Sequence, residues 1–226
     1  MIRNKFTRVK TAKGRKKSST AWLKRQLNDV YVKEAKAMGY RSRAAFKLIE
    51  INDKFKFLKS GKVIVDLGAA PGGWSQIAVE KVGKGNVFAV DILEMEEIEG
   101  VKSIQQDFLA PNAHEIIIDV IKKDLQKSKN TKCDILLSDM ASNSCGDAKT
   151  DHLRIVAMLE EVLDFAFKVL NENGSFVCKI FQGGAGGELL KKIKQNFATV
   201  KHFKPESSRK ESVENYIIAL GFKLRF

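Results

Sequence analysis

Acidic and basic side chains follow several short apolar runs of this sequence, at the points where strands are predicted to end. These residues are Asp66, Asp91, Asp107, Asp139 and Lys179. The carboxyl ends of parallel strands share one edge of a sheet, so we expect the five side chains to gather there. Carboxylates that accept hydrogen bonds, together with a lysine, could hold a ligand and move a proton.

Lys179, the lysine of this group, is predicted to have apolar neighbours in its strand. Lys179 lies between Cys178 and Ile180 in a run that predicts a strand. Burial or a neighbouring cation lowers the pKa of a lysine, which a general base needs in order to take a proton from an alcohol. A neighbouring carboxylate such as Asp139 would have the opposite effect, so the sequence leaves the net shift open.

A glycine-rich turn, residues 66–74, follows the first predicted strand. Its pattern Asp66-x-Gly68-x-x-x-Gly72 resembles the first motif of S-adenosylmethionine-dependent methyltransferases. A dinucleotide site would need G-x-G-x-x-G, but Ala70 and Pro71 stand there, and proline removes a donor amide. A turn that binds no ligand is the remaining alternative. Behind such a turn, Asp91 is expected to hold a ribose diol and Asp107 to reach an adenine amino group.

The apolar pattern predicts one α/β domain with a mostly parallel sheet and helices on both faces. Helices are expected at residues 22–38, 42–58 (with Ser42 as N-cap), 74–81, 111–129, 151–170 (closed by Asn173-Gly174) and 189–197, and strands at 63–65, 87–91, 103–106, 133–138, 175–179, 199–204 and 216–222.

The net charge of +13 is concentrated at the N-terminus. Residues 1–28 hold ten Lys or Arg residues and no acid, while the other 198 residues carry 30 basic against 27 acidic side chains. We therefore predict a basic flexible arm over residues 1–20, followed by a single domain over 21–226. Such an arm is typical of proteins that bind nucleic acid, although a solvated tail or a targeting segment would have the same composition.

Cysteine, histidine and hydropathy patterns exclude several classes of protein. The three cysteines form no C-x-x-C pair and the three histidines no metal-ligand spacing, so neither a disulfide framework nor a metal site is expected. No apolar run approaches the roughly 20 residues of a membrane span, and no signal sequence is recognised. A soluble cytoplasmic protein is predicted.

Several motifs in order resemble the FtsJ/RrmJ family of ribosomal RNA large subunit 2′-O-ribose methyltransferases, from about Ser18 to Phe226. The motifs are Trp22-Leu23, Asp29-x-Tyr31-Val32, Arg41-Ser42-Arg43-Ala44-Ala45-Phe46-Lys47-Leu48, Asp66 to Ser75, Ser138-Asp139-Met140-Ala141, Lys179-x-Phe181-Gln182-Gly183 and Ser212-x-Glu214-x-Tyr216-Ile217. One departure is the segment Gly183 to Gly187, which is richer in glycine than the family pattern.

The resemblance implies a class I S-adenosylmethionine-dependent methyltransferase fold, Rossmann-like, with a seven-stranded sheet whose last strand is antiparallel. It also implies a catalytic tetrad of Lys47, Asp139, Lys179 and Glu214. The cofactor contacts expected with it are Asp66, Gly68, Ala69, Pro71, Gly72, Gly73, Trp74, Asp91, Ile92, Asp107, Phe108 and Asp139. The implied substrate is a uridine 2′-hydroxyl in 23S rRNA of the large ribosomal subunit, modified by a monomer without a metal.

Two other functions remain open. Relatives with the same tetrad methylate the ribose of tRNA or of mRNA caps, so either of these RNAs is an alternative substrate. A non-catalytic RNA-binding factor in ribosome assembly is the third possibility.

Overall fold

The computed structural model describes residues 7–9, 14, 16–125, 132–141, 146–181 and 187–224. Within these residues seven strands form one sheet, in the order β3-β2-β1-β4-β5-β7-β6. The strands are β1 (Ile64–Leu67), β2 (Val87–Asp91), β3 (Val101–Gln105), β4 (Cys133–Ser138), β5 (Leu170–Phe181), β6 (Phe197–Phe203) and β7 (Glu214–Phe222).

Strand β7 is antiparallel to both of its neighbours in the sheet. Strands β1 to β5 pair in parallel, whereas β7 lies between β5 and β6 and is antiparallel to both. The predicted class I methyltransferase fold, a mostly parallel seven-stranded sheet with an antiparallel last strand, is thereby confirmed.

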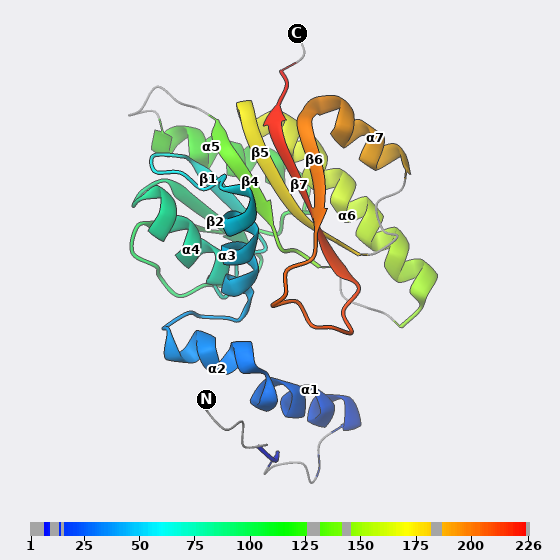
Figure 1. The fold of residues 1–226 in the computed structure, drawn as a ribbon. Coiled ribbons are helices and arrows are strands. Elements are labelled where there is room, and N and C mark those ends of the chain that lie inside the picture. The colour runs from blue at the N-terminus through cyan, green and yellow to red at the C-terminus, as the bar shows by residue number, and fades with distance from the viewer. Residues whose placement is uncertain are drawn as a thin grey trace.

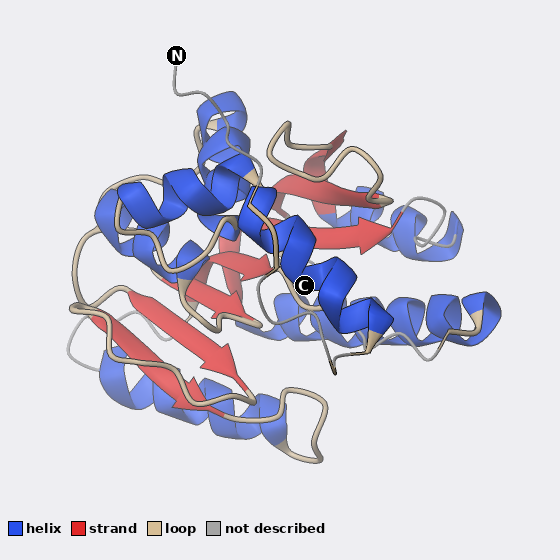
Figure 2. Cartoon of the chain, turned by 90° about the horizontal axis from the view of Figure 1, so that it is seen from below, coloured by secondary structure: helices blue, strands red, loops and turns tan. Residues whose placement is uncertain are grey.

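Helices cover both faces of the sheet (Figures 1 and 2). The helices are α1 (Lys17–Asn28), α2 (Val30–Ala37), α3 (Ala44–Phe55), α4 (Gly73–Val82), α5 (Ala113–Leu125), α6 (Ala148–Val169) and α7 (Gly187–Asn196). Helices α3 and α4 share one core cluster with the sheet, and α5, α6 and α7 share the other. In Figure 1, α1 and α2 lie below this three-layer body.

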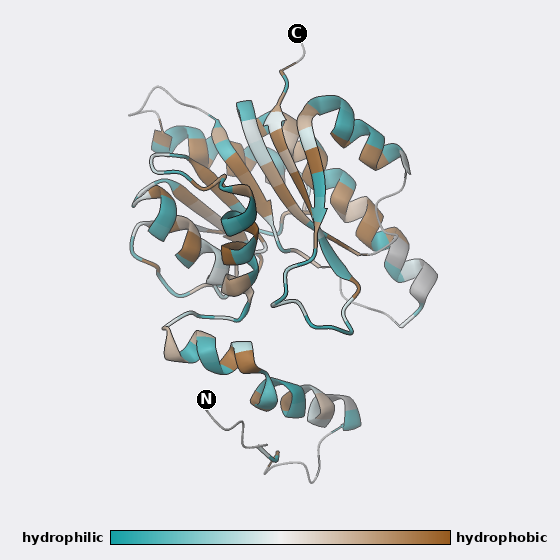
Figure 3. Ribbon diagram, viewed as in Figure 1, coloured by the Kyte–Doolittle hydropathy of each residue, from teal (hydrophilic) through white to brown (hydrophobic). Residues whose placement is uncertain are grey.

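Successive side chains of the buried strands pack alternately into the two core clusters. Val65 and Leu67 of β1 pack toward α5 and α6, whereas Ile64 packs toward α3 and α4. Successive side chains of a strand point to opposite faces, so an apolar run is needed where both faces are covered. Figure 3 shows the resulting concentration of hydrophobic residues in the central strands.

The N-terminal helices differ from the prediction. The single helix expected over residues 22–38 is two helices, and the first begins earlier, at Lys17. The helices are separated by Asp29, whose backbone is extended and whose carboxylate accepts the amide of Tyr31 as the N-cap of α2. Periodicity alone did not reveal this cap.

The start of α3 also corrects a prediction. Arg43, rather than Ser42, occupies the N-cap position of α3. The buried Ser42 hydroxyl has no hydrogen-bond partner among the residues that the structure describes. The carbonyl of Ser42 instead accepts the amide of Ala45, which closes the first turn.

The predicted turn at Asn173-Gly174 lies inside β5 instead of closing α6. Helix α6 ends at Val169 and β5 begins directly at Leu170. Asn173 has φ +61°, and the pairing with β4 shifts register between Cys133 and Ile135. A Cβ on Gly174 would meet the Asn171 carbonyl oxygen at 2.8 Å, so this irregularity requires glycine.

The described residues bear in part on the predictions about membrane spans, cysteines, the basic arm and the glycine-rich segment. Across the described ranges, no helix is long and apolar enough to cross a membrane. Cys133 and Cys178 are free and buried, while Cys145 lies outside the described residues. Most of the basic arm and residues 183–186 of the glycine-rich segment also lie outside them.

Candidate active site

Two neighbouring strands place a lysine and a tyrosine side by side. Lys179 of β5 and Tyr216 of β7 are partners in the antiparallel register. Directly opposite residues share a face of the sheet. This face is covered by α3 and α4, because Val177 and Tyr216 belong to the core cluster of those helices.

The Asp139 carboxylate contacts three polar side chains, those of Lys179, Tyr216 and Lys47. Asp139 follows β4, the strand next to β5. Its Oδ1 lies 3.2 Å from Lys179 Nζ and accepts a 2.6 Å hydrogen bond from the Tyr216 hydroxyl. Lys179 also donates to the backbone carbonyl of Asp139. Lys47 Nζ of α3 lies 3.8 Å from the other carboxylate oxygen.

Glu214 completes the group from the start of β7. Its carboxylate lies 3.1 Å from Lys47 Nζ, and its amide donates to the Ser212 hydroxyl. The structure thus brings together Lys47, Asp139, Lys179 and Glu214, which the sequence placed far apart. Only 7% of Lys47 and 7% of Lys179 is exposed, so each cation depends on its carboxylate partners.

The cluster favours an ionised aspartate. Burial disfavours the charged form of the Asp139 carboxyl, but the ammonium groups of Lys179 and Lys47 outweigh this effect, so the pKa of Asp139 lies below its ordinary value. The Tyr216 hydroxyl is fully buried beside this anion, which raises its pKa and keeps it a hydrogen-bond donor.

Tyr216 is a site residue that the sequence did not identify. Its ring lies 5.7 Å from that of Trp74, centroid to centroid, and the Trp74 indole donates to the Ala44 carbonyl. The available signal was the spacing Glu214-x-Tyr216, because residues two apart in a strand share a face. Reading it would also have required knowing which strand is paired with Lys179.

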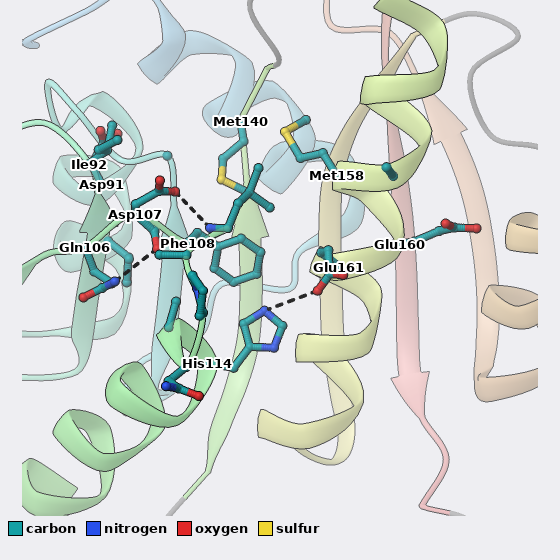
Figure 4. A pocket seen from close by; sticks show the side chains of 18 of the residues that line it. Asp91, Ile92, Gln106, Asp107, Phe108, His114, Met140, Met158, Glu160 and Glu161 are labelled. Atoms are coloured by element: carbon teal, nitrogen blue, oxygen red, sulfur yellow. Dashed lines mark hydrogen bonds and ion pairs between the residues drawn. The ribbon is translucent and has the colours of Figure 1, made fainter. Parts of the chain in front are cut away.

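A cavity of about 1000 Å³ opens beside this cluster, at the carboxyl ends of β1, β2 and β4. Six predicted cofactor residues line it: Gly68, Asp91, Ile92, Asp107, Phe108 and Asp139. Figure 4 shows four of them, Asp91, Ile92, Asp107 and Phe108. Asp139 therefore belongs both to the cavity and to the cluster of lysines. The two are adjoining parts of one site.

Gly68 keeps the floor of the cavity open. Its φ of +72° favours glycine, and a Cβ there would meet Met140 Cγ at 2.5 Å. The backbone of the turn can therefore lie directly against Met140. A side chain at this position would displace one wall of the cavity.

The two acids on the cavity wall are oriented by backbone amides. Asp91 accepts Ala70 N at 2.9 Å on one oxygen and Leu93 N at 2.8 Å on the other. Asp107 accepts Leu109 N at 3.0 Å. Each carboxylate oxygen has a second lone pair, so both acids retain acceptor capacity toward the cavity.

The other predicted cofactor residues, Asp66, Ala69, Pro71, Gly72, Gly73 and Trp74, are not among the residues that line the cavity. Several fasten the turn to the start of α3. A Cβ on Gly73 would meet Ser42 Oγ at 2.3 Å, and the Arg41 guanidinium donates to the Pro71 carbonyl. Trp74 is buried beneath Tyr216, so it supports the lysine side of the site.

Helices α5 and α6 supply cavity residues that no sequence motif marked. The His114 ring lies 4.8 Å from the Phe108 ring, centroid to centroid, at a tilt of 35°, and its Nε2 lies 3.9 Å from the Glu161 carboxylate (Figure 4). Burial, followed by the Lys168 cation, lowers the pKa of His114. These residues come from distant helices, and only the packing of α5 against α6 brings them together.

Sequence comparisons identify close relatives over nearly the whole chain. The profile of the family described as FtsJ-like methyltransferase matches residues 40–222. A Rickettsia bellii (strain RML369-C) protein is 52% identical over 227 residues, which cover 98% of this chain and 96% of that protein. A Rhodopseudomonas palustris (strain BisA53) protein is 53% identical over 219 residues, which cover 95% and 90%. Both are named ribosomal RNA large subunit methyltransferase E.

Solved structures agree with the fold. A crystal structure from Plasmodium falciparum, described as a ribosomal RNA methyltransferase, has a TM-score of 0.72 and 32% identity, covering 82% of this chain and 100% of that one. A Lactococcus lactis structure described as a hemolysin has a TM-score of 0.56 at 18% identity, covering 80% and 88%. The second likeness concerns the fold alone.

Asp66 makes the unfolding free energy of the protein depend on pH. It lies within β1, is only 1% exposed and accepts a 2.7 Å hydrogen bond from the Ser75 hydroxyl of α4. Burial raises the pKa of its carboxyl from 3.8 to about 7. Because the folded state then binds this proton more tightly than the unfolded state, stability is lost as pH rises toward the folded-state pKa.

We predict that Asp66→Asn flattens this pH dependence, because the amide oxygen can still accept from Ser75 but carries no charge. Between about pH 5 and about pH 8 the unmodified protein should lose about 2 to 3 kcal/mol more unfolding free energy than the variant. Urea unfolding at several pH values measures the difference. Parallel pH profiles would show that Asp66 does not titrate in this range.

Proposed function

We infer that this chain, which belongs to the FtsJ-like methyltransferase family, transfers a methyl group from S-adenosylmethionine to a ribose 2′-hydroxyl of RNA. We propose a uridine in the 23S rRNA of the large ribosomal subunit as the acceptor. The names of the bacterial relatives support ribosomal RNA as the substrate. The observation that supports this reaction is the cluster at the edge of the cavity, in which Lys47 and Lys179 contact Asp139 and Glu214 contacts Lys47.

The cavity fits an adenosine-containing cofactor. Its volume of about 1000 Å³ and its backbone floor at Gly68 leave space for the ligand. The free lone pairs of Asp91 suit the ribose hydroxyls, and Asp107 with Phe108 suits the adenine. S-adenosylmethionine, when bound, supplies a methyl group on a positively charged sulfur. The Asp139 carboxylate on the cavity wall would favour that charge.

Lys179 is proposed to orient the 2′-oxygen and to accept its proton. Two of its contacts, to the carboxylate and to the backbone carbonyl, come from the same residue, Asp139. An ammonium group has three donors, so the nitrogen retains one direction for the substrate. In the amine form this direction holds a lone pair that can take the hydroxyl proton. Positioning of this kind is a large part of the catalysis of such a transfer.

Lys47, Glu214 and Tyr216 hold this arrangement from the α3 and β7 side. Lys47 bridges Glu214 and Asp139, and Tyr216 fixes one oxygen of Asp139 toward Lys179. The partly exposed Glu214 carboxylate is proposed to accept a hydrogen bond from the acceptor ribose. One chain supplies all of these groups, so we propose that a monomer acts on the large subunit in the cytoplasm.

We predict that Lys179→Ala lowers the rate of methyl transfer about 100- to 10,000-fold, the usual contribution of a general base. Lys179→Arg separates the two roles, because arginine can donate a hydrogen bond but cannot accept a proton. Equal losses in the two variants support proton transfer, whereas substantial activity in the arginine variant would restrict Lys179 to orientation. Transfer of labelled methyl to ribosomal subunits measures the rates.

Cofactor affinity is the control for these variants. Lys179 is not among the lining residues of the cavity, so calorimetry should find similar S-adenosylmethionine binding in all three proteins. Full activity of Lys179→Ala would reject the proposed role. Failure of the unmodified protein to bind S-adenosylmethionine would favour the non-catalytic assembly factor instead.

The substrate assignment needs its own comparison. Large subunits, free 23S rRNA, tRNA and capped RNA should be offered in parallel with labelled cofactor. Ribosomal RNA should be preferred, and mapping of the modified ribose in cells with and without the protein should identify a uridine. Preferential labelling of tRNA or of capped RNA would reassign the substrate but leave the reaction unchanged.

The basic arm generates a further prediction. Residues 17–20 of the predicted arm belong to α1, and the part that precedes this helix, residues 1–16, contains seven Lys or Arg residues. Thr7 is joined to Asn28 of α1 by hydrogen bonds of 2.8 and 3.0 Å. Deletion of residues 1–16 should weaken RNA binding and flatten its salt dependence, by about 0.7 to 0.9 in log–log slope for each phosphate that these residues neutralise. A variant with glutamine at the seven positions is the matched control for length. An unchanged slope would indicate a solvated tail.

A further inference from the structure

The Trp22-Leu23 motif has no part in the site described above, and the structure places it on α1. Trp22 is 50% exposed, whereas Leu23 is half-buried. Trp74, the other tryptophan of the chain, is only 2% exposed. Tryptophan is enriched at interfaces because its ring has a large apolar area that changes little in shape, so Trp22 is a candidate contact for a partner.

The surroundings of Trp22 are basic. Helix α1 carries three cations and no acid, and one of them, Arg25, lies three residues after Trp22 on the same side of the helix. Residues 1–28 together hold ten Lys or Arg and no acid. Thr7, in the segment before α1, is hydrogen-bonded to Asn28 at the end of this helix. A partner that meets Trp22 therefore also meets a positive field, which favours a polyanion.

The exposed apolar side chains of α1 do not form the stripe that a protein groove would accept. An amphipathic helix in a groove presents anchors at positions i, i+3, i+4 and i+7. The exposed large apolar side chains of α1, among the residues that the structure describes, are Trp22 and Leu27. These residues are five positions apart, which is about 140° around a helix of 3.6 residues per turn. Trp22 is therefore a single exposed ring on a basic helix.

Helix α1 lies on the same side of the molecule as the catalytic cluster. In Figure 1 the arrow of β7 points away from α1 and α2, so β5, which is antiparallel to β7, ends on their side. Lys179 is close to that end of β5. Helix α2 is packed there, because its Tyr31 ring lies 5.4 Å from that of Phe46 in α3, centroid to centroid. Trp22 precedes Asp29, the N-cap of α2, by about 10 Å along α1. An RNA held at the cluster can therefore extend to α1.

We propose that Trp22 stacks on an unpaired base of the substrate RNA. This inference rests on the proposed function, since it takes RNA as the substrate. Every base has a π-face, so stacking on an aromatic ring tolerates any sequence, and Arg25 adds attraction for a neighbouring phosphate. Trp22 is not among the residues that line the cofactor cavity. The contact thus contributes to RNA affinity and leaves the transfer step to the catalytic cluster.

Tryptophan fluorescence tests the contact directly, because Trp22 is exposed and Trp74 is buried. The probe is a single-stranded oligouridylate of about ten nucleotides, within the usual range of single-strand sites. It should quench the emission of the unmodified protein but not that of Trp22→Phe, in which only Trp74 emits. A duplex of the same length, whose bases are already stacked, should quench much less. Equal quenching of the two proteins by the single strand would reject the proposal.

Anisotropy of the labelled oligouridylate measures the affinity. Trp22→Leu keeps an apolar residue of high helix propensity but removes the ring, so it should weaken binding about 5- to 100-fold, the usual effect of losing one stacked base. Trp22→Phe should lose less, because it retains a ring. Leu27→Ala changes the other exposed apolar position of α1 and is the matched control, with unchanged affinity.

Methyl transfer to large ribosomal subunits measures the effect on the natural reaction. The subunits come from cells that lack this protein. Trp22→Leu should raise the KM for subunits and leave both kcat and S-adenosylmethionine affinity unchanged. A lower kcat at unchanged KM would assign Trp22 to the transfer step and contradict the proposal.

The outcomes separate this proposal from the proposed function. If Trp22→Leu binds the oligouridylate as tightly as the unmodified protein, Trp22 does not stack on a base; a raised KM for subunits in that case would indicate that α1 contacts a ribosomal protein. The oligouridylate measurements require no methyl transfer. They therefore decide the role of Trp22 even if the unmodified protein methylates no RNA, the outcome that would reject the proposed function.

Discussion

The structure depends on the burial of charge at Asp139. Two lysines that are almost inaccessible to water need an anion, and this one carboxylate contacts both. Its partners come from α3, β5 and β7, so the ion pairs form only when these elements pack in the observed order. Removal of one partner would leave a buried charge uncompensated, which costs far more than the pair contributes. The chemistry and the fold therefore constrain each other at this point.

Asp139 also divides the site into two regions with different construction. On the side of α5 and α6, backbone amides orient Asp91 and Asp107, and Gly68 keeps the floor open. On the side of α3 and β7, side chains hold one another through charges and the Tyr216 hydroxyl. A region built from backbone suits a ligand of fixed shape. A region built from side chains suits the adjustment of proton positions.

Much of the fold was predictable because strands buried on both faces are continuous apolar runs, and β2 and β4 have the predicted bounds. The four tetrad residues were found by resemblance and do lie together. The insertion of β7 beside β5, and hence the role of Tyr216, depends on pairing across distant segments that no local pattern encodes. The same holds for His114 and Glu161 in the cavity wall. At Asp29 and Ser42, local hydrogen bonding decided the helix ends against the prediction.

The position of β7 has a consequence for synthesis of the protein. Among the residues that the structure describes, β7 follows the other six strands in sequence, yet it occupies an interior place in the sheet between β5 and β6. While the ribosome is still making residues 214–222, β5 has one unpaired edge, which is a template for aggregation. Lys179 also lacks Tyr216 and Glu214 until that moment. A nascent chain therefore has an open sheet edge and an incomplete site together, and the docking of β7 closes both.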